Sequence, residues 1–222
     1  DLNKPVVAIT STTDSKGYWL VASDGGVFSY GDARFYGSAN NINLNKPIVG
    51  ITSTPDSKGY WLVASDGGVF AYGDAKFYGS ATNITLNRPI VGIISTSDGR
   101  GYWLVASDGG VFAYGDATYY GSANNIDLNK PIVGITSTPD SKGYWLVASD
   151  GGVFAYGDAT YYGSANNIDL NKPIVGITST PDSKGYWLVA SDGGVFAYGD
   201  ANFYGSATNL HLNQPAISIQ GE

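Results

Sequence analysis

A carboxylate recurs beside aromatic residues along this 222-residue chain, in the stretch Tyr-Gly-Asp-Ala. A carboxylate next to an aromatic ring can bind a sugar, because its oxygens accept hydrogen bonds from sugar hydroxyls while sugar C–H groups pack on the ring. The stretch also has a structural explanation, since Asp in a turn often bonds its own backbone. The candidate ligand-binding residues are Asp32, Asp74, Asp116, Asp158 and Asp200, with Tyr36, Tyr78, Tyr120, Tyr162 and Tyr204.

Tryptophan belongs to a second recurring motif, Gly-Tyr-Trp-Leu-Val-Ala-Ser-Asp-Gly-Gly. An exposed Trp could stack on a sugar, but here it lies between Tyr and Leu in an apolar run, which favours burial. We therefore expect Trp19, Trp61, Trp103, Trp145 and Trp187 to lie in the core. The Asp of this motif begins an Asp-Gly turn, which accounts for it, and the Asp-x-Asp-x-Asp spacing of a calcium loop is absent.

Composition excludes several kinds of chemistry. The chain has no Cys and only one His, His211, so zinc-thiolate sites, thiol nucleophiles and multi-histidine sites are excluded. A net charge of −7 with 12 basic residues argues against a nucleic-acid partner. No apolar run is long enough for a membrane span, and we expect no catalytic residues, no metal and no cofactor. The chain begins without Met, and we expect it to be a mature or excised piece.

The Gly-Tyr-Trp motif starts at Gly17 and recurs every 42 residues. Such a period is typical of propellers and other repeat architectures. We expect one repeat domain over residues 1–222, with repeats 2–43, 44–85, 86–127, 128–169 and 170–211 and a partial closing strand over 212–222. Because the repeats are nearly identical, identity between them does not indicate functional constraint.

Each repeat predicts four strands, as its fourth copy illustrates. The predicted strands are a short run rich in β-branched residues over 131–138, two apolar runs over 144–149 and 153–156, and a weaker strand over 160–164. Pro139 to Gly143 predicts a hairpin turn in which Gly takes the left-handed position, and Asp150-Gly151 predicts a tight hairpin. No segment has a helical period.

Four antiparallel strands in 42 residues are typical of a propeller blade. The second strand is apolar on both faces, as expected for a sheet between two neighbours. The first strand carries small residues, which suit a crowded position near a central axis. We therefore predict an all-β, five-bladed β-propeller with an extra C-terminal strand.

The first strand has six copies, whereas the others have five. The last copy, residues 215–220, alternates apolar with polar or small residues, as a capping strand does. It could replace the 6–12 strand in closing a ring, one of the two could be surplus, or the piece could come from a longer array. The sequence leaves these alternatives open.

The full unit, Leu-Asn-Lys-Pro-Ile-Val-Gly-Ile-Thr-Ser-Thr-Pro-Asp-Ser-Lys-Gly-Tyr-Trp-Leu-Val-Ala-Ser-Asp-Gly-Gly-Val-Phe-Ala-Tyr-Gly-Asp-Ala, resembles a repeat of secreted and surface proteins of actinobacteria and related bacteria. There the arrays often accompany hydrolase or peptidoglycan-acting domains. The resemblance covers essentially the whole chain and implies an extracellular or cell-surface location and modular use. Asp-Gly-Gly-Val-Phe-Ala-Tyr-Gly-Asp also resembles the core of regulator-of-chromosome-condensation-type blades. Five blades are similar to tachylectin-type sugar-binding propellers by fold alone.

Near-identical blades favour binding over catalysis, because enzymatic propellers usually hold one asymmetric site. Several equivalent weak sites suit avid binding of a repeating polymer. We therefore predict a secreted, lectin-like module that is not an enzyme and whose partner is a glycan or cell-wall polymer. The alternative is a structural or protein-interaction scaffold attached to neighbouring domains of a larger surface protein or hydrolase. A laboratory-made array is a third reading, against which Ile94, Ser97 and Arg100 argue because they depart from the other repeats.

Overall fold

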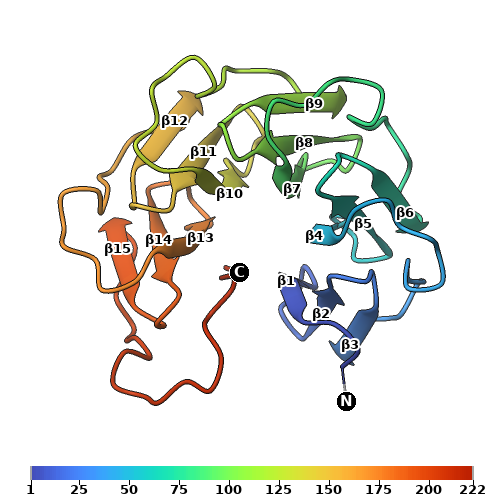
Figure 1. Cartoon of the computed structure of the whole chain (residues 1–222), viewed down its shortest axis with the longest axis horizontal. Helices are drawn as coiled ribbons and strands as arrows, with labels where there is room; N and C mark the ends of the chain where they lie inside the picture. Colours follow the sequence, from blue (N-terminus) through green and yellow to red (C-terminus); the bar gives the residue numbers. More distant parts are fainter. Residues whose placement is uncertain (1, 222) are drawn as a thin grey trace. The chain divides into compact units, whose positions relative to one another are not determined.

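A computed structural model describes residues 2–221 (Figure 1). The chain is all-β: each repeat forms a three-stranded antiparallel sheet, and the five sheets are the blades of a β-propeller. The first three sheets contain β1 (Val6–Ser11), β2 (Gly17–Ala22) and β3 (Val27–Gly31); β4 (Ile48–Ser53), β5 (Gly59–Ala64) and β6 (Val69–Gly73); and β7 (Ile90–Ser95), β8 (Gly101–Ala106) and β9 (Val111–Gly115). The last two contain β10 (Ile132–Ser137), β11 (Gly143–Ala148) and β12 (Val153–Gly157); and β13 (Ile174–Ser179), β14 (Gly185–Ala190) and β15 (Val195–Gly199). No helix long and apolar enough to cross a membrane occurs in the part of the chain that is described.

The prediction of four strands per repeat is wrong by one strand. Residues 160–164, expected to pair as a fourth strand, join no sheet, and the same holds for the matching segments of the other repeats within residues 2–221. Side chains satisfy the backbone there instead. The Trp145 indole N–H donates to the Thr160 carbonyl at 2.8 Å, and the Tyr186 hydroxyl donates to the Gly163 carbonyl at 2.5 Å. The segment is thus held by side chains of its own sheet and of the following sheet, without a backbone ladder.

The two predicted hairpins are present, but in one of them a different residue takes the left-handed backbone conformation. In the Asp-Gly turn, Gly151 has φ 84° and the Gly152 N–H donates to Asp150 Oδ1 at 3.1 Å, as predicted. In the Pro139–Gly143 turn, Ser141 rather than Gly143 takes the left-handed conformation, with φ 60°. Gly143 is needed for a close approach, since a Cβ there would lie 2.5 Å from the Ala159 backbone nitrogen.

The chain forms two compact units. The first, residues 2–106 and 111–119, contains the sheets β1–β3, β4–β6 and β7–β9, and the first strands of these sheets lie side by side. In this unit, Trp19 packs with Tyr60 and Leu62 of the next sheet, and all three are fully buried. The second, residues 107–110 and 120–221, contains β10–β12 and β13–β15 and repeats this packing with Trp145. The expectation that Trp side chains form the core between sheets is confirmed at these positions.

Every residue of β5 is buried, so both faces of this strand are covered, as the apolar pattern predicted. The first strand of the sheet pairs with it in antiparallel register, with Ser53 opposite Tyr60. A register shift between Ile48 and Gly50 marks a bulge. The third strand pairs on the other side, with Tyr60 opposite Tyr72.

The predicted C-terminal strand is also wrong, because residues 212–221 join no sheet. The segment nevertheless packs in the second unit: the Ala216 N–H donates to the Ser191 carbonyl at 2.9 Å, and the Gly221 N–H donates to Thr178 Oγ1 at 2.9 Å. A first strand pairs only with the second strand of its own repeat, and this last copy has none. The C-terminal segment does not replace β1 in the first sheet, since β1 pairs with β2.

Candidate ligand-binding cavity

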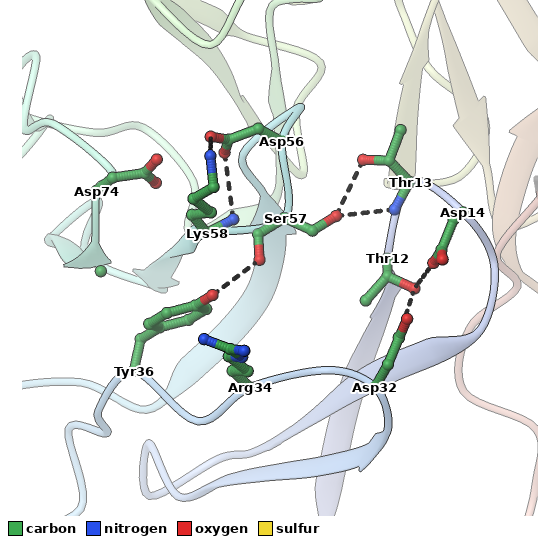
Figure 2. A pocket seen from close by; sticks show the side chains of 11 residues that line it. Thr12, Thr13, Asp14, Asp32, Arg34, Tyr36, Asp56, Ser57, Lys58 and Asp74 are labelled. Atoms are coloured by element: carbon green, nitrogen blue, oxygen red, sulfur yellow. Dashed lines mark hydrogen bonds and ion pairs between the residues drawn. The ribbon is translucent and has the colours of Figure 1, made fainter.

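A cavity of about 740 Å³ opens beside the turns of the first two repeats, within the first unit (Figure 2). It brings together three of the predicted site residues, Asp32, Tyr36 and Asp74. Figure 2 shows the two carboxylates on opposite sides, with Tyr36 and Arg34 between them. The remaining lining residues are Thr12, Thr13, Asp14, Asp56, Ser57, Lys58 and Gly73. A volume of this size fits a small ligand or a short stretch of polymer.

Asp32 is placed by the sharp turn that ends β3. Gly31 adopts φ 67° there, and the Asp32 N–H donates to the Lys16 carbonyl at 3.4 Å. The turn brings the Asp32 carboxylate beside the β1–β2 hairpin, where Thr12 Oγ1 lies 3.3 Å from Asp32 Oδ1. The carboxylate itself stays exposed to solvent.

A hydroxyl and two carboxylates cluster in the same hairpin. Thr12 Oγ1 lies 2.9 Å from Asp14 Oδ1, 3.1 Å from the Gly17 carbonyl and 3.3 Å from Asp32 Oδ1. Because a hydroxyl has one proton, it cannot donate to all three oxygens at once. Asp32 is the farthest of the three acceptors, so its carboxylate keeps capacity for an external donor.

Lysine neutralises the other carboxylate of the cluster. Lys16 Nζ lies 3.0 Å from Asp14 Oδ2. Its hydrogen bond is the main reason that the pKa of Asp14 falls to about 2. Lys58 and Lys184 lower the pKa of Asp56 and Asp182 to about 2 in the same way. These carboxylates are therefore ionised at neutral pH.

The third repeat departs from this pattern because Arg100 stands in place of Lys. Its Nε lies 3.7 Å from Asp98 Oδ2, farther than the lysines of the other repeats lie from their partners. The backbone N–H of Arg100 is the main group that lowers the pKa of Asp98. Removal from water, followed by the hydrogen bond with Asp98, raises the pKa of Asp116. The two carboxyls of the third repeat therefore shift in opposite directions, with the pKa of Asp98 lowered and that of Asp116 raised.

Tyr36 is a link between sheets as well as a lining residue. Its hydroxyl donates to the Ser57 carbonyl at 3.1 Å, and its ring lies 5.9 Å from that of Tyr60. Tyr78, Tyr120 and Tyr162 make the equivalent hydrogen bond in their repeats. Tyr204 does not, and it is 85% exposed. Ligand contact by these tyrosines stays a prediction. In Tyr36, Tyr78, Tyr120 and Tyr162 the hydroxyl proton is already donated to a backbone carbonyl, so the ring is the part that can contact a ligand.

Sequence reasoning missed an exposed aromatic in every repeat, one residue before each of these tyrosines. The side chains are 55–61% exposed: Phe35, Phe77, Tyr119, Tyr161 and Phe203. The signal was available, because neighbouring side chains in an extended segment point to opposite sides, and a half-buried Tyr36 implies an outward Phe35. An aromatic side chain that stays exposed at the same place in all repeats is suited to contact a ligand or a protein.

No group of three or more His, Cys, Asp or Glu side chains that could hold a metal ion occurs among residues 2–221. The Asp-Gly carboxylates serve their turns: Asp24 Oδ1 accepts from the Gly26 N–H at 3.0 Å, and Asp66 and Asp108 do the same in their repeats.

Comparison with known proteins finds a structure of similar architecture but no protein of similar sequence. No family model matches the chain, and neither does any curated protein. Among solved structures, the chain is similar to the β-propeller domain of Myceliophteria thermophila Cps50 (Swd1), with a TM-score of 0.59 over 92% of this chain and 68% of that one. The two sequences are 10% identical, so the likeness shows the fold alone.

Proposed function

We propose that the protein is a non-catalytic module that binds a glycan or cell-wall polymer through equivalent sites, one beside each inter-repeat turn. The observation that carries this proposal is the cavity of about 740 Å³ in which Asp32, Asp74 and Tyr36 meet. Its carboxylates can accept hydrogen bonds from sugar hydroxyls, and the exposed Phe35 lies one residue from its edge.

The charge of the cavity favours a neutral polymer or a polymer of amino sugars as the ligand. Its lining residues include four carboxylates and two cations, and the whole chain carries −7. Anionic polymers are therefore disfavoured, whereas an ammonium group on a sugar is attracted. One of these cations is not present in every repeat. The position of Arg34 holds Lys76 in the second repeat but an uncharged residue in the later ones: Thr118, Thr160 and Asn202.

Repetition supports a binding role over catalysis. The Tyr-Gly-Asp-Ala stretch recurs every 42 residues, so a polymer with a regular spacing can occupy several sites at once. Linked weak sites gain avidity of about 10²–10⁴ over one site. The resemblance to repeats of secreted and surface bacterial proteins supports an extracellular or cell-surface location, where such polymers occur.

A scaffold for protein partners is the second candidate. The exposed aromatic of each repeat supports it, because aromatic side chains are enriched at the energetic centres of protein interfaces. In that case the carboxylates beside the turns would be dispensable.

The test is binding of the full chain to chitin oligosaccharides, partly deacetylated chitosan oligosaccharides and soluble peptidoglycan fragments, by calorimetry with and without a chelator. We expect saturable, chelator-insensitive binding. A variant with Asn at Asp32, Asp74, Asp116, Asp158 and Asp200 should lose it, because an amide oxygen accepts hydrogen bonds from sugar hydroxyls less strongly than a carboxylate does. All five side chains are exposed, and Asn keeps their size. The matched control is Asp127→Asn, which changes an exposed carboxylate in a connecting loop. Absence of binding to all probes, or binding that the five-site variant retains, would overturn the proposal; a protein partner that needs Phe35 and its equivalents would support the scaffold.

A further inference from the structure

One position of each repeat combines a fixed backbone with a variable side chain. It lies two residues after the candidate carboxylate, just beyond the third strand. Its carbonyl accepts a hydrogen bond from the Trp indole N–H of the same repeat at 2.7–2.8 Å, whether the residue is Arg34, Lys76, Thr118, Thr160 or Asn202. Because a buried Trp holds the backbone in the same way each time, the repeats differ in the side chain that they present there and not in the fold.

The side chains at this position are open to a ligand. All five residues are exposed. Lys76 is exposed although its sheet has a neighbouring sheet on either side within the first unit, so the exposure does not depend on where a unit ends. Arg34 lines the cavity described above, and Figure 2 shows it between the Asp32 and Asp74 carboxylates.

Arg34 is the cation of this cavity that is left for a ligand. The other one, Lys58, donates through Nζ to Asp56 Oδ2 at 2.9 Å. Arg34 forms no side-chain hydrogen bond or ion pair within residues 2–221. A guanidinium presents several N–H donors in a planar fork that matches the two oxygens of a carboxylate. The chemical group that fits Arg34 is therefore a carboxylate.

The two carboxylates beside Arg34 attract the opposite charge. The Asp74 carboxylate forms no ion pair among the residues that the structure describes, and Asp32 Oδ1 has only the distant Thr12 hydroxyl at 3.3 Å. Both side chains are exposed. An ammonium group donates strong, charge-assisted hydrogen bonds to carboxylates. The cavity thus presents one cation between two anions, and a ligand that carries an ammonium group and a carboxylate matches both kinds of charge.

We propose that Arg34 is a specificity-determining residue and that the cavity of the first repeat binds an amino sugar that also carries a carboxylate. The inference rests on the proposed function and names the sugar for that site. The ligand carboxylate lies on the Arg34 guanidinium, while its ammonium group lies against Asp32 or Asp74. A polymer of such sugars has no net charge, so the acidic chain does not repel it.

The same position grades the other repeats. Lys76 gives the second repeat a weaker form of this contact, because an ammonium group is a point charge without the planar fork of a guanidinium. The later repeats carry Thr118, Thr160 and Asn202, which are uncharged and offer hydroxyl or amide groups instead. The repeats therefore share their carboxylates and differ in whether they also hold an anionic group.

Four monosaccharides separate the two charges of the ligand. N-acetylglucosamine carries neither charge, glucosamine carries only the ammonium group, N-acetylmuramic acid carries only the carboxylate, and muramic acid carries both. The measurement is an NMR titration of the ¹⁵N-labelled full chain with each sugar, followed at the Asp32 backbone N–H and the Arg34 Nε–H. The chain has three Arg residues, so Arg88 and Arg100 serve as internal references in the same spectrum.

We expect muramic acid to bind about fivefold more tightly than glucosamine, which is the effect of an exposed ion pair at the upper end of its range. Muramic acid should also shift the Arg34 Nε–H signal, which glucosamine should leave in place. N-acetylmuramic acid should bind more weakly than muramic acid, because it lacks the group that the two carboxylates attract.

Arg34→Thr introduces the residue that the third and fourth repeats carry at this position, so the fold tolerates it. It should abolish the preference for muramic acid without weakening glucosamine binding. The matched control is Arg88→Thr, which removes the same charge from an exposed position in a connecting loop and should leave both affinities unchanged. In the reverse direction, Thr160→Arg should make the Asp158 backbone N–H respond more strongly to muramic acid than to glucosamine.

A preference for muramic acid that Arg34→Thr abolishes and Arg88→Thr retains supports the inference. Equal binding of muramic acid and glucosamine, or a preference that Arg34→Thr retains, overturns it and leaves the proposed function standing on glucosamine binding. N-acetylmuramic acid that binds as tightly as muramic acid also overturns it, since the ammonium group would then contribute nothing. Absence of binding by all four sugars overturns the inference, and the calorimetry with oligosaccharides decides the proposed function separately.

Discussion

Replacement of Tyr102 by Phe removes one oxygen atom from the contact between two neighbouring sheets. That hydroxyl donates to the Gly79 carbonyl at 2.6 Å and accepts from the Tyr78 N–H at 3.1 Å, and the side chain is fully buried. Phe keeps the ring packing, so the change isolates the two hydrogen bonds. Each buried polar group left without a partner costs about 1–3 kcal/mol. Two groups lose their partner, and both hydrogen bonds are only partly buried, so the cost lies at the lower end of this range. We therefore expect Tyr102→Phe to lower the free energy of unfolding by about 2–4 kcal/mol.

The assay is guanidinium unfolding followed by Trp fluorescence. Tyr18→Phe is the matched control, because this hydroxyl occupies the same place in the first repeat but has no partner within the described residues. We expect the control to stay within about 0.5 kcal/mol of the natural chain. A Tyr102→Phe variant as stable as the Tyr18→Phe variant would refute the reasoning, since the interface would then be held by ring packing alone. A lower slope of the unfolding transition would show that the repeats had begun to unfold separately.

Three further predictions concern the turns and the core. Ser183→Gly should stabilise the chain by about 1 kcal/mol in the same assay, because Ser183 has φ 61° and a buried hydroxyl without a hydrogen-bond partner within residues 2–221. Ser57→Gly should gain less, because its Oγ accepts from the Thr13 N–H at 2.8 Å, and an equal gain would contradict this account. Lys184→Met should move the Asp182 pKa from about 2 toward 3.8 in a carbon NMR titration. Since folding lowers this pKa, its contribution to stability is present above about pH 4 and is lost as the pH falls toward 2, and an Asp182 pKa unchanged by Lys184→Met would disprove the ion pair. Trp61→Phe should destabilise the chain by about 2–3 kcal/mol in thermal unfolding, because it loses packing volume and the bond from Nε1 to the Lys76 carbonyl at 2.7 Å, and a loss below about 0.5 kcal/mol would exclude a core role.

Much of one repeat could be predicted from the residues alone. The β-branched run of the first strand, the apolar run of the second and the Asp-Gly hairpin between the second and third are local signals, and each strand lies within two residues of the expected range. The left-handed residue of the other hairpin was placed wrongly. Gly143 was expected there from backbone freedom, but it is required for close approach, and Ser141 takes the positive φ instead.

The fourth segment shows why pattern alone overcounted the strands. Thr, Tyr and Tyr have high β propensity, yet propensity describes fitness for a half-buried pleated surface and not the presence of a pairing edge. In residues 160–164 the carbonyls that a ladder would use are taken by the Trp145 indole and the Tyr186 hydroxyl. Those two groups come from different repeats, so no window of one repeat contains the information.

The sequence by itself determined the repeat and the first three strands of each repeat, because the 42-residue period and the apolar spacing are properties of the chain taken locally. It also placed carboxylates and tyrosines once per repeat. Only the tertiary structure decided that Asp32, Tyr36 and Asp74 share a cavity, since Asp74 comes from the second repeat, Asp32 and Tyr36 come from the first, and the two repeats meet only when their sheets pack. It likewise decided that identical tyrosines differ in environment: Tyr60 is buried and bonded to the Gly37 carbonyl of the preceding repeat, while Tyr18 is 39% exposed. Burial depends on neighbours, and neighbours are set by packing rather than by the residues of one repeat.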